Sequence, residues 1–239
     1  MAISENLKRL ASAFTVRDIM VTIGDLVCAT GESDAASLSK SHPDFNLIPI
    51  KNGNGLSAYY SRDSHQLSQI VVPDLIGDGT GILDLVDILE SREFVFVLGP
   101  KHIDGYIHFS DLNRSLVKFT FYVLLQEVEC VALDLVKARL TDDDFLEGTL
   151  GTRRFAQIQQ SYKRAGDAGQ SIINYLNIAD ALKLARGGGK LGIEDSTIQA
   201  IKRVRDGAAH VSENLVSDYR DVMKLAEVKS QCLQVLRDS

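Results

Sequence analysis

The sequence changes character near residue 112, and this change limits what the two parts of the chain can fold into. From Asp111 to Leu140 there is neither glycine nor proline, the two residues least favourable inside a helix. Apolar residues recur there every three to five positions, which is the spacing of one helical face. We therefore predict a single helix of about 30 residues, about 45 Å long at 1.5 Å per residue. It would join a β-rich N-terminal part to a helical C-terminal part.

The N-terminal part begins with a unit of about 50 residues. A helical stretch is followed by an apolar run at 45–50, the turn sequence Asn52-Gly53-Asn54-Gly55 and a second apolar run at 56–60. Asn-Gly between two such runs predicts a β-hairpin. The unit ends near an acidic residue, Asp63.

The same order of patterns then repeats. Residues 82–89 have helical spacing, residues 94–98 form an apolar strand pattern, and a last strand is predicted at 106–109. Gly-Pro and Asp-Gly pairs mark the loops between them. This second unit also ends on an acidic residue, Asp111.

The repeat resembles a tandem pair of CBS domains. Val16-Arg17-Asp18-Ile19-Met20 is similar to the start of a first CBS unit, and Gly105-Tyr106-Ile107-His108-Phe109-Ser110-Asp111 is similar to the end of a second. The resemblance implies an adenine nucleotide as a regulatory ligand. It also implies that the closing aspartate, Asp111 in the second unit and Asp63 in the first, accepts hydrogen bonds from both ribose hydroxyls, a role that suits a carboxylate.

The two aspartates have a second interpretation. An Asp directly after a strand often caps the following helix, and Ser110-Asp111 precedes an apolar helix. The sequence also departs from the family, because the position of its Ser or Thr holds Tyr60 in the first unit and His108 in the second. Helix capping and nucleotide binding therefore both remain open at Asp63 and Asp111.

The C-terminal part is predicted to be a bundle of about five helices, counting the end of the long helix. The other four are expected at 153–164, 171–185, 194–205 and 214–236. The tract Gly187-Gly188-Gly189-Lys190 lacks the frame of a phosphate loop, so we interpret it as a loop between helices. Asp142-Asp143-Asp144 is interpreted as a solvated helix start rather than a metal site, because adjacent side chains point in different directions.

A possible chemical site is the pair Arg205 and His210. On an ideal helix the two would lie about 140° apart, but a kink at Gly207 could bring them together, because glycine loosens a helix. An imidazole can move a proton at neutral pH, and a guanidinium can stabilise a phosphate in the transition state. Lys202 and Arg203 add positive charge beside the pair.

This pair, in a helical context, resembles the RX4-6H motif of HEPN domains, many of which are metal-independent ribonucleases. The resemblance implies that His210 acts as general acid or base and that Arg205 stabilises the pentacovalent phosphate. Lys202 and Arg203 would contact RNA. The 2′-OH would attack the phosphate, leaving a 2′,3′-cyclic phosphate and a 5′-OH end. It also implies a site formed across a homodimer. Ser212 stands where some HEPN toxins carry a modified Tyr, so control by that modification is not expected.

Charge and cysteine content set further limits. Residues 1–140 carry 12 basic and 18 acidic residues, a net charge of −6, whereas residues 141–239 carry 14 of each. The acidic total argues against a general nucleic-acid coat protein, but a local phosphate site remains compatible. Cys28, Cys130 and Cys232 have neither metal-ligand nor disulfide spacing, which favours reduced thiols in the cytoplasm. Residues 1–5 lack the layout of a signal peptide and the apolar runs are too short to cross a membrane, so neither a signal peptide nor a membrane segment is expected.

The sequence and these resemblances thus predict an α+β protein. A CBS pair of β-α-β-β-α repeats, at 13–63 and 64–115, would be joined by the long helix to a HEPN-like helical bundle at 116–239. The expected function is a ribonuclease that needs no metal and is regulated by an adenine nucleotide, in stress response, phage defence or a toxin–antitoxin system. Its partners would be RNA, a second copy of the chain and an antitoxin where one exists, with no membrane. The alternative is a non-enzymatic nucleotide sensor whose helical part serves in dimerisation or binding.

Overall fold

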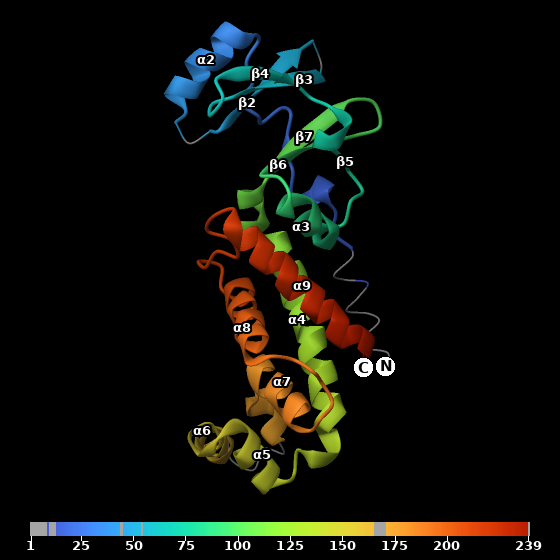
Figure 1. Cartoon of the computed structure of the whole chain (residues 1–239), viewed down its shortest axis with the longest axis vertical. Coiled ribbons are helices and arrows are strands. Elements are labelled where there is room, and N and C mark those ends of the chain that lie inside the picture. Colours follow the sequence, from blue (N-terminus) through green and yellow to red (C-terminus); the bar gives the residue numbers. More distant parts are fainter. Residues whose placement is uncertain (1–8, 10–12, 44, 54, 165–170, 239) are drawn as a thin grey trace. The chain divides into compact units, whose positions relative to one another are not determined.

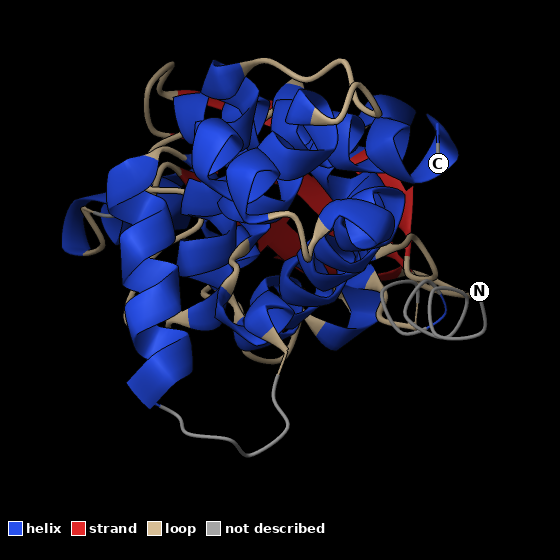
Figure 2. Ribbon diagram, turned by 90° about the horizontal axis from the view of Figure 1, so that it is seen from below, coloured by secondary structure: helices blue, strands red, loops and turns tan. Residues whose placement is uncertain are grey.

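The protein consists of two compact units. They comprise residues 13–116, here the N-terminal unit, and residues 117–239 together with 1–12, here the C-terminal unit. All strands of the described chain lie in the N-terminal unit, and the described elements of the C-terminal unit are helices (Figures 1 and 2). The fold class is therefore α+β. The computed structural model describes residues 9, 13–43, 45–53, 55–164 and 171–238.

The N-terminal unit alternates short strands with short helices. In chain order it contains η1 (Val16–Asp18), β1 (Val21–Thr22), α2 (Glu32–Ser41), β2 (Leu47–Asn52), β3 (Gly55–Ser61), β4 (Gln66–Gln69), η2 (Val72–Asp74), β5 (Leu75–Gly77), α3 (Ile82–Glu90), β6 (Phe94–Leu98), β7 (Ile103–His108) and η3 (Phe109–Asn113).

These strands form two sheets. One has the order β1-β7-β6-β5, in which only the β5–β6 pair is parallel. The other is the antiparallel sheet β2-β3-β4. The predicted hairpin is confirmed, because Asn52 pairs with Gly55, and Gly53 has the positive φ of 60° that a tight hairpin turn requires. Asn54 lies outside the described residues.

Aromatic side chains connect the two sheets. Tyr59 of β3 packs against Phe94 and Phe96 of β6, with ring centroids 5.3 and 5.9 Å apart. Tyr106 of β7 packs on the same two phenylalanines at 5.9 and 5.6 Å. Since offset and edge-to-face pairs at such distances are favourable, this cluster fixes β3 beside β6 and β7. The cavities described below lie next to it.

The first repeat differs from the predicted β-α-β-β-α order. After β3 the chain turns at residues 62–65 and continues into β4, where a second helix was expected. His65 occupies the turn with a positive φ of 54°. Residues 70–72 are Ile-Val-Val, followed by Pro73, and β-branched residues before a proline favour an extended chain. The two repeats are therefore not equivalent.

The C-terminal unit is a helical bundle. Its elements are α4 (Ser115–Val136), η4 (Lys137–Arg139), α5 (Asp143–Leu150), α6 (Thr152–Arg164), η5 (Ile172–Tyr175), α7 (Ile178–Gly187), α8 (Asp195–Ala209) and α9 (Arg220–Asp238). The long helix is real but shorter than predicted, with 22 residues. Arg114 has an extended backbone (φ −64°, ψ 149°), so η3 ends there and α4 begins one residue later.

Other helix boundaries also needed correction. The helix predicted at 171–185 is divided, because Asn177 is extended and caps α7 through Asp180. The helix predicted from residue 214 begins at Arg220. The short helix α5 was not predicted as a separate element, although its start was: the Asp142 side chain accepts a hydrogen bond from the Phe145 amide at 3.0 Å. Among the described residues, no helix combines the length and apolarity that crossing a bilayer requires.

Candidate functional site

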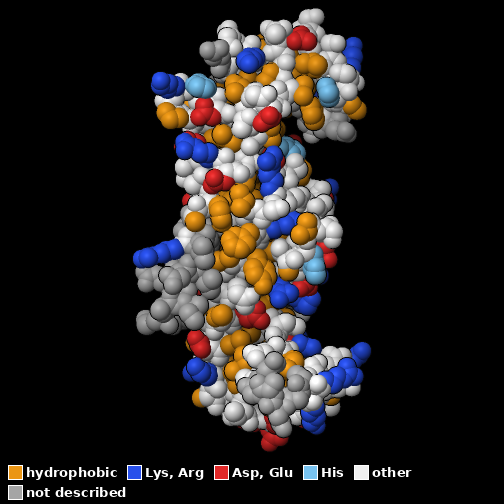
Figure 3. Space-filling model, turned by 180° about the vertical axis from the view of Figure 1, so that it is seen from behind, with side chains coloured by type: hydrophobic (Ala, Val, Ile, Leu, Met, Phe, Trp, Pro, Cys, Tyr) orange, Lys and Arg blue, Asp and Glu red, His pale blue; other side chains and the backbone are white. Residues whose placement is uncertain are grey.

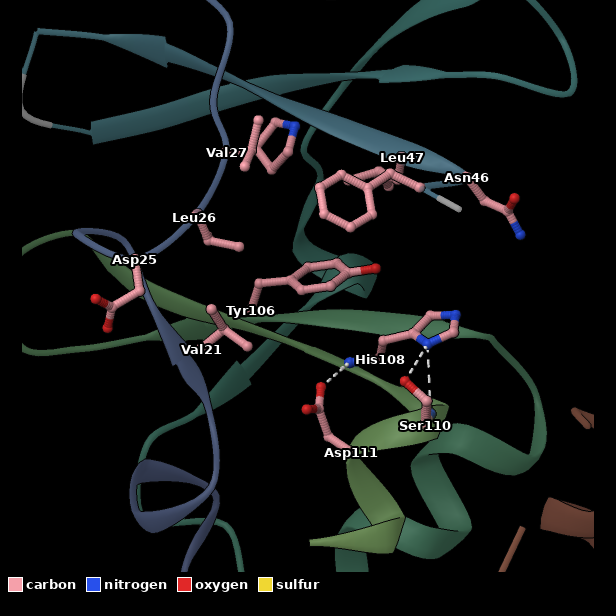
Figure 4. Close-up of a pocket in the computed structure, with 12 residues that line it drawn as sticks. Val21, Asp25, Leu26, Val27, Asn46, Leu47, Tyr106, His108, Ser110 and Asp111 are labelled. Atoms are coloured by element: carbon pink, nitrogen blue, oxygen red, sulfur yellow. Dashed lines mark hydrogen bonds between the residues drawn. The ribbon is translucent and has the colours of Figure 1, made fainter. Parts of the chain in front are cut away.

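The N-terminal unit contains a cavity of about 460 Å³ between the edge of the β2 sheet and the end of β7. Apolar side chains from Val21, Leu26, Leu47 and Tyr106 line much of it (Figure 4). One edge is polar and is formed by His108, Ser110 and Asp111. This combination of an apolar wall and a few converging polar groups is typical of small-molecule sites, whose volumes are about 300–1,000 Å³.

Asp111 both caps a helix and lines this cavity. One carboxylate oxygen, Oδ2, accepts a hydrogen bond from the His108 backbone amide at 2.9 Å. The other, Oδ1, accepts one from Nε of Arg114 at 2.8 Å. Asp111 thus completes the capping box of η3, whose N-cap residue is His108, and does not itself cap the apolar helix α4 as the capping interpretation expected. These hydrogen bonds fix the carboxylate in place. Because each carboxylate oxygen has a further lone pair, capping leaves acceptor capacity toward the cavity.

His108 lies beside Asp111 and is held by Ser110. Its Nδ1 lies 3.3 Å from the Ser110 amide, which donates to it, and 2.8 Å from the Ser110 hydroxyl. Since Nδ1 accepts, the proton of the neutral ring is on Nε2, which points away from Ser110 in Figure 4. Burial lowers the pKa of His108, against the opposing effects of Asp111 and Glu93. His108 is therefore a neutral N–H donor at neutral pH.

Tyr106 forms the wall behind His108. Burial, reinforced by the carboxylates of Asp111 and Glu93, raises the pKa of the Tyr106 phenol well above its ordinary value. The phenol therefore stays protonated and can donate a hydrogen bond. Tyr106 and His108 were quoted in the sequence motif but were not predicted as site residues. The alternation of side chains along β7 was the available signal, because Tyr106 and His108 share one face of that strand.

Asp63 lies at a second cavity, of about 410 Å³. It follows β3 and is exposed, and the hydroxyl residues Ser61, Ser64 and Ser68 line the same space. The two cavities share four residues: Asn46, Leu47, Tyr106 and His108. The structure thus places Asp63 and Asp111 in adjacent cavities with a common wall, although Asp63 does not precede a helix.

The Arg–His motif lies at the end of α8. That helix continues through Gly207 to Ala209, so Gly207 does not end it, and His210 is the first residue with an extended backbone. A Cβ at Gly207 would lie 3.4 Å from the carbonyl oxygen of Asn214, which is ordinary van der Waals contact, so packing does not require glycine at this position. No hydrogen bond or ion pair joins the Arg205 and His210 side chains, both within the described part of the chain.

Arg205 interacts with acidic groups of its own unit. Its Nη1 is 3.8 Å from Oδ1 of Asp206, and its charge opposes the burial that raises the pKa of Glu129. The Nε of Arg205 is buried and has no hydrogen-bond partner among the described residues. The Arg205 side chain is 33% exposed, so part of its guanidinium remains accessible.

The predicted basic cluster is partly neutralised. Asp206 lies 2.5 Å from Nζ of Lys202 as well as beside Arg205. Arg203 is exposed, and His210 is exposed at the end of the helix. Because Asp206 competes with a phosphate for Lys202 and Arg205, this cluster attracts anions less strongly than its sequence suggests.

The backbone after His210 is fixed by Lys118 of α4. Its ammonium nitrogen donates to the carbonyl oxygens of His210 at 3.3 Å and Val211 at 2.9 Å, and also to that of Glu213. The Lys118 residue is only 7% exposed. The sequence offered no sign of this contact, because 92 residues separate Lys118 from His210.

Other reactive groups show no convergence. Among the described residues, no three His, Cys, Asp or Glu side chains gather as a metal site would require. The three cysteines are free thiols, of which Cys232 is buried and Cys130 exposed. Burial raises the pKa of the Cys232 thiol to about 12, so this cysteine is not a nucleophile near neutral pH.

Comparisons with known proteins give few similarities. No protein-family model matches the sequence, and no curated protein matches it. Three structures of the CBS domain of the bacterial CNNM/CorC family Mg²⁺ transporter match 48% of this chain. The complex with ATP is 12% identical in sequence, and the match covers 94% of its chain. The complex with the inhibitor IGN95a is 12% identical over 82% of its chain, and the third structure is 14% identical over 81% of its chain. The TM-score is 0.37 in each case.

Proposed function

We propose that the N-terminal unit is a tandem CBS pair that binds an adenine nucleotide in the cavity at Asp111. The observation that supports this most is the Asp111 carboxylate, held by the His108 amide and Arg114 at the edge of a 460 Å³ cavity. A fixed carboxylate with spare lone pairs can accept hydrogen bonds from two vicinal hydroxyls, as in a ribose. The apolar wall formed by Leu26, Leu47 and Tyr106 suits a flat base.

His108 would complete the site. Its Nε2–H group can donate to a base nitrogen or a phosphate oxygen in the space that both cavities share. The second cavity, with Asp63 and three serines, would take part of the same ligand or a second nucleotide. The non-equivalent repeats favour different affinities for the two cavities, because no helix follows Asp63.

Calorimetric titration with AMP, ADP, ATP and cyclic dinucleotides tests this proposal. Asp111→Asn keeps an oxygen to cap η3 but loses the charge, so we expect affinity to fall at least about tenfold, or about 1.4 kcal/mol. The matched control is Asp104→Asn in β7, which pairs with His102 and does not line either cavity. The absence of binding by the unmodified protein at saturating concentrations of every nucleotide would contradict the proposal.

We further propose that the C-terminal unit is a ribonuclease of the HEPN type, because its Arg205–His210 pair resembles the RX4-6H motif. We also propose that nucleotide binding regulates this activity. Support comes from the exposure of His210 and Arg203 and from the buried Arg205 Nε that lacks a partner within the described chain. Because Arg205 and His210 do not meet within one chain, the catalytic site would need a second copy, whose Arg205 would face His210. The rival function is non-enzymatic dimerisation or binding of a protein such as an antitoxin.

Cleavage of labelled RNA in excess EDTA tests this second proposal. We expect fragments with 2′,3′-cyclic phosphate ends, and loss of at least about 100-fold in rate for His210→Ala, as for removal of a general acid or base. His102→Ala is the control, because this histidine is also exposed but lies in the other unit. If the original protein and His210→Ala are both inactive, with and without nucleotides, the ribonuclease proposal is contradicted. The non-enzymatic function in dimerisation or protein binding then remains.

A further inference from the structure

One face of α6 carries positive charge that has no ion-pair partner among the described residues. The helix Thr152–Arg164 contains four basic residues and no acidic one. Taking Arg153 as reference on an ideal helix, Arg164 lies about 20° away and Lys163 about 80° away around the axis. Arg154 points elsewhere and is bound by Asp180. The remaining exposed residues of this surface, here the α6 basic face, are Ala156, Gln157, Gln160 and Ser161.

The three cations of the α6 basic face gather on one helix, whereas other exposed cations without an ion pair to the described residues, such as Lys190, Arg220 and Arg237, are spread along the chain. Arg153, Lys163 and Arg164 are exposed and form no ion pair with any described residue. By contrast, several basic residues elsewhere in the unit each contact a carboxylate. These are Arg139 with Asp142, Arg186 with Asp195, Lys202 with Asp206, and Lys224 with Asp221. Positive charge on α6 is thus left available to an external partner.

Helix stability does not account for this pattern. Lys163 and Arg164 are in the last turn, where a cation is favourable, but Arg153 is in the first turn, where the helix dipole disfavours it. No acidic residue occupies that first turn. The placement of Arg153 therefore costs stability unless an anion binds beside it.

An open groove of about 700 Å³ runs along this face. Gln157 and Gln160 line it together with Lys163 and Arg164, so it offers amide donors and acceptors as well as charge. Gln159 also lines the groove and donates to Asp143 of α5 at 3.5 Å. Figure 3 shows Lys and Arg side chains gathered over α6.

The composition of the α6 basic face selects among anionic partners. A membrane-binding helix needs a large apolar face, and the exposed apolar residue on this face is only Ala156 within the described chain. An acidic peptide is usually anchored by buried aromatic or aliphatic side chains, and Ala156 provides no pocket for them. Cations and amides along about 16 Å of helix, from Arg153 to Arg164, suit a chain of regularly spaced phosphates.

We propose that the α6 basic face binds the phosphate backbone of single-stranded RNA, with Arg153, Lys163 and Arg164 contacting phosphates and Gln157 and Gln160 contacting sugars or bases. The choice of RNA rests on the ribonuclease proposed for the same unit. The face itself is separate from the Arg205–His210 motif. It would hold the substrate strand while other residues carry out the reaction.

Fluorescence anisotropy with a labelled RNA of about 20 nucleotides tests this proposal. The full-length protein with His210→Ala is used in EDTA, so that binding is measured without cleavage. Exchange of Arg153, Lys163 and Arg164 for Gln should weaken binding at least about tenfold near 50 mM salt. It should also reduce the slope of log K against log salt by about 2, as expected for three lost phosphate contacts to a single strand.

The control removes the same charge elsewhere on the unit. Three exposed basic residues are exchanged for Gln in this control, namely Lys190, Arg220 and Arg237. Its affinity should stay within about twofold, and both triple variants should keep the circular dichroism and melting temperature of the parent, because all six side chains are exposed. Equal weakening by the control, or unchanged binding by the α6 variant, would overturn the proposal.

Competitors and a cleavage assay separate the remaining outcomes. Single-stranded DNA of the same sequence should bind within a few-fold, because phosphates are the main contacts. Tighter binding of duplex RNA than of the single strand, or displacement of RNA by polyglutamate at equal charge, would assign the face to another partner and overturn the proposal. If binding depends on α6 but no RNA is cleaved, the ribonuclease fails and the binding face remains. If RNA is cleaved but the α6 variant binds it as tightly as the parent, the proposed binding face is wrong and the ribonuclease proposal still stands.

Discussion

Nζ of Lys118 donates a hydrogen bond to the backbone carbonyl of His210 across 3.3 Å. The same nitrogen also serves the carbonyls of Val211 and Glu213. A buried cation thus acts as the C-terminal cap of α8, where backbone carbonyls lack helical partners. It determines the path of the chain that carries the candidate catalytic histidine.

Exchange of Lys118 for Met should therefore destabilise the C-terminal unit. Met keeps most of the side-chain volume but leaves three carbonyls without their donor, and we expect a loss of about 2–4 kcal/mol in the free energy of unfolding. Urea unfolding measures this loss, and hydrogen exchange should show faster exchange around residues 210–216. Lys224→Met, at a lysine side chain that is 73% exposed, should change stability by less than about 0.5 kcal/mol. Equal stability of the Lys118 variant would contradict a capping role.

Much of the N-terminal fold could be predicted from local patterns. The hairpin at residues 52–55 and the helix over 82–89 follow from turn residues and from helical spacing, and both are present. These signals are local, because a turn needs positive φ at Gly53 and a helix buries every third or fourth side chain. The place of Asp111, shortly after the last strand of the N-terminal unit, follows from the same local patterns.

Features that depend on distant packing could not be predicted. Gly207 was expected to interrupt α8, yet it lies buried inside the helix, beside Asn214 and Leu215. The contact of Lys118 with the chain after His210 spans 92 residues. The ion pair of Asp206 with Lys202 was not predicted either. In each case the deciding partner is remote or is set by a side-chain direction, which sequence spacing does not specify.

The ion pair of Arg154 and Asp180 should be a major determinant of bundle stability. Nη2 of Arg154 lies 2.6 Å from Oδ2 of Asp180, and Nε of Arg154 lies 3.1 Å from both carboxylate oxygens. Asp180 is only 5% exposed, so Arg154→Met leaves a buried carboxylate without its cation. We expect this exchange to cost about 3–5 kcal/mol in chemical denaturation. Arg153→Met, at the neighbouring exposed residue, should cost less than about 0.5 kcal/mol.

A double exchange separates the pair from simple loss of packing. Replacing Arg154 with Met and Asp180 with Leu removes both charges, so the variant avoids an unpaired buried ion. It should be more stable than Arg154→Met alone, although the cap at Asn177, which donates to Asp180 at 3.0 Å, is lost. A double variant less stable than both single variants would show that the charges contribute little beyond the cap.

Glu129 should make stability depend on pH. Burial raises the pKa of this carboxyl above its ordinary value of 4.5, although Arg205 and Gln126 oppose the effect. A carboxyl with a raised folded-state pKa binds more protons in the folded protein than in the unfolded chain. Stability therefore falls as pH rises from 4.5 through the raised pKa. Unfolding at a series of pH values should show this decline, and Glu129→Gln should remove it.

Arg205→Met provides the complementary measurement. Without the nearby guanidinium the pKa of Glu129 should rise further, so the decline of stability with pH should become steeper and extend to higher pH. The double variant with Glu129→Gln should show no such decline. If Arg205→Met leaves the pH profile unchanged, Arg205 does not interact with Glu129, and its guanidinium is directed elsewhere.

His108 should report the arrival of a nucleotide phosphate through its own titration. Burial lowers its pKa, so the ring is neutral at neutral pH, and a phosphate beside Nε2 would favour the protonated form. NMR titration of the imidazole should therefore show a higher midpoint with saturating AMP than without it. By linkage, nucleotide affinity should increase as pH falls from about 8 to about 6, and His108→Gln should abolish this increase. If the titration midpoint of His108 is the same with and without bound nucleotide, His108 does not contact the phosphate. The nucleotide site would then consist of the apolar wall and Asp111.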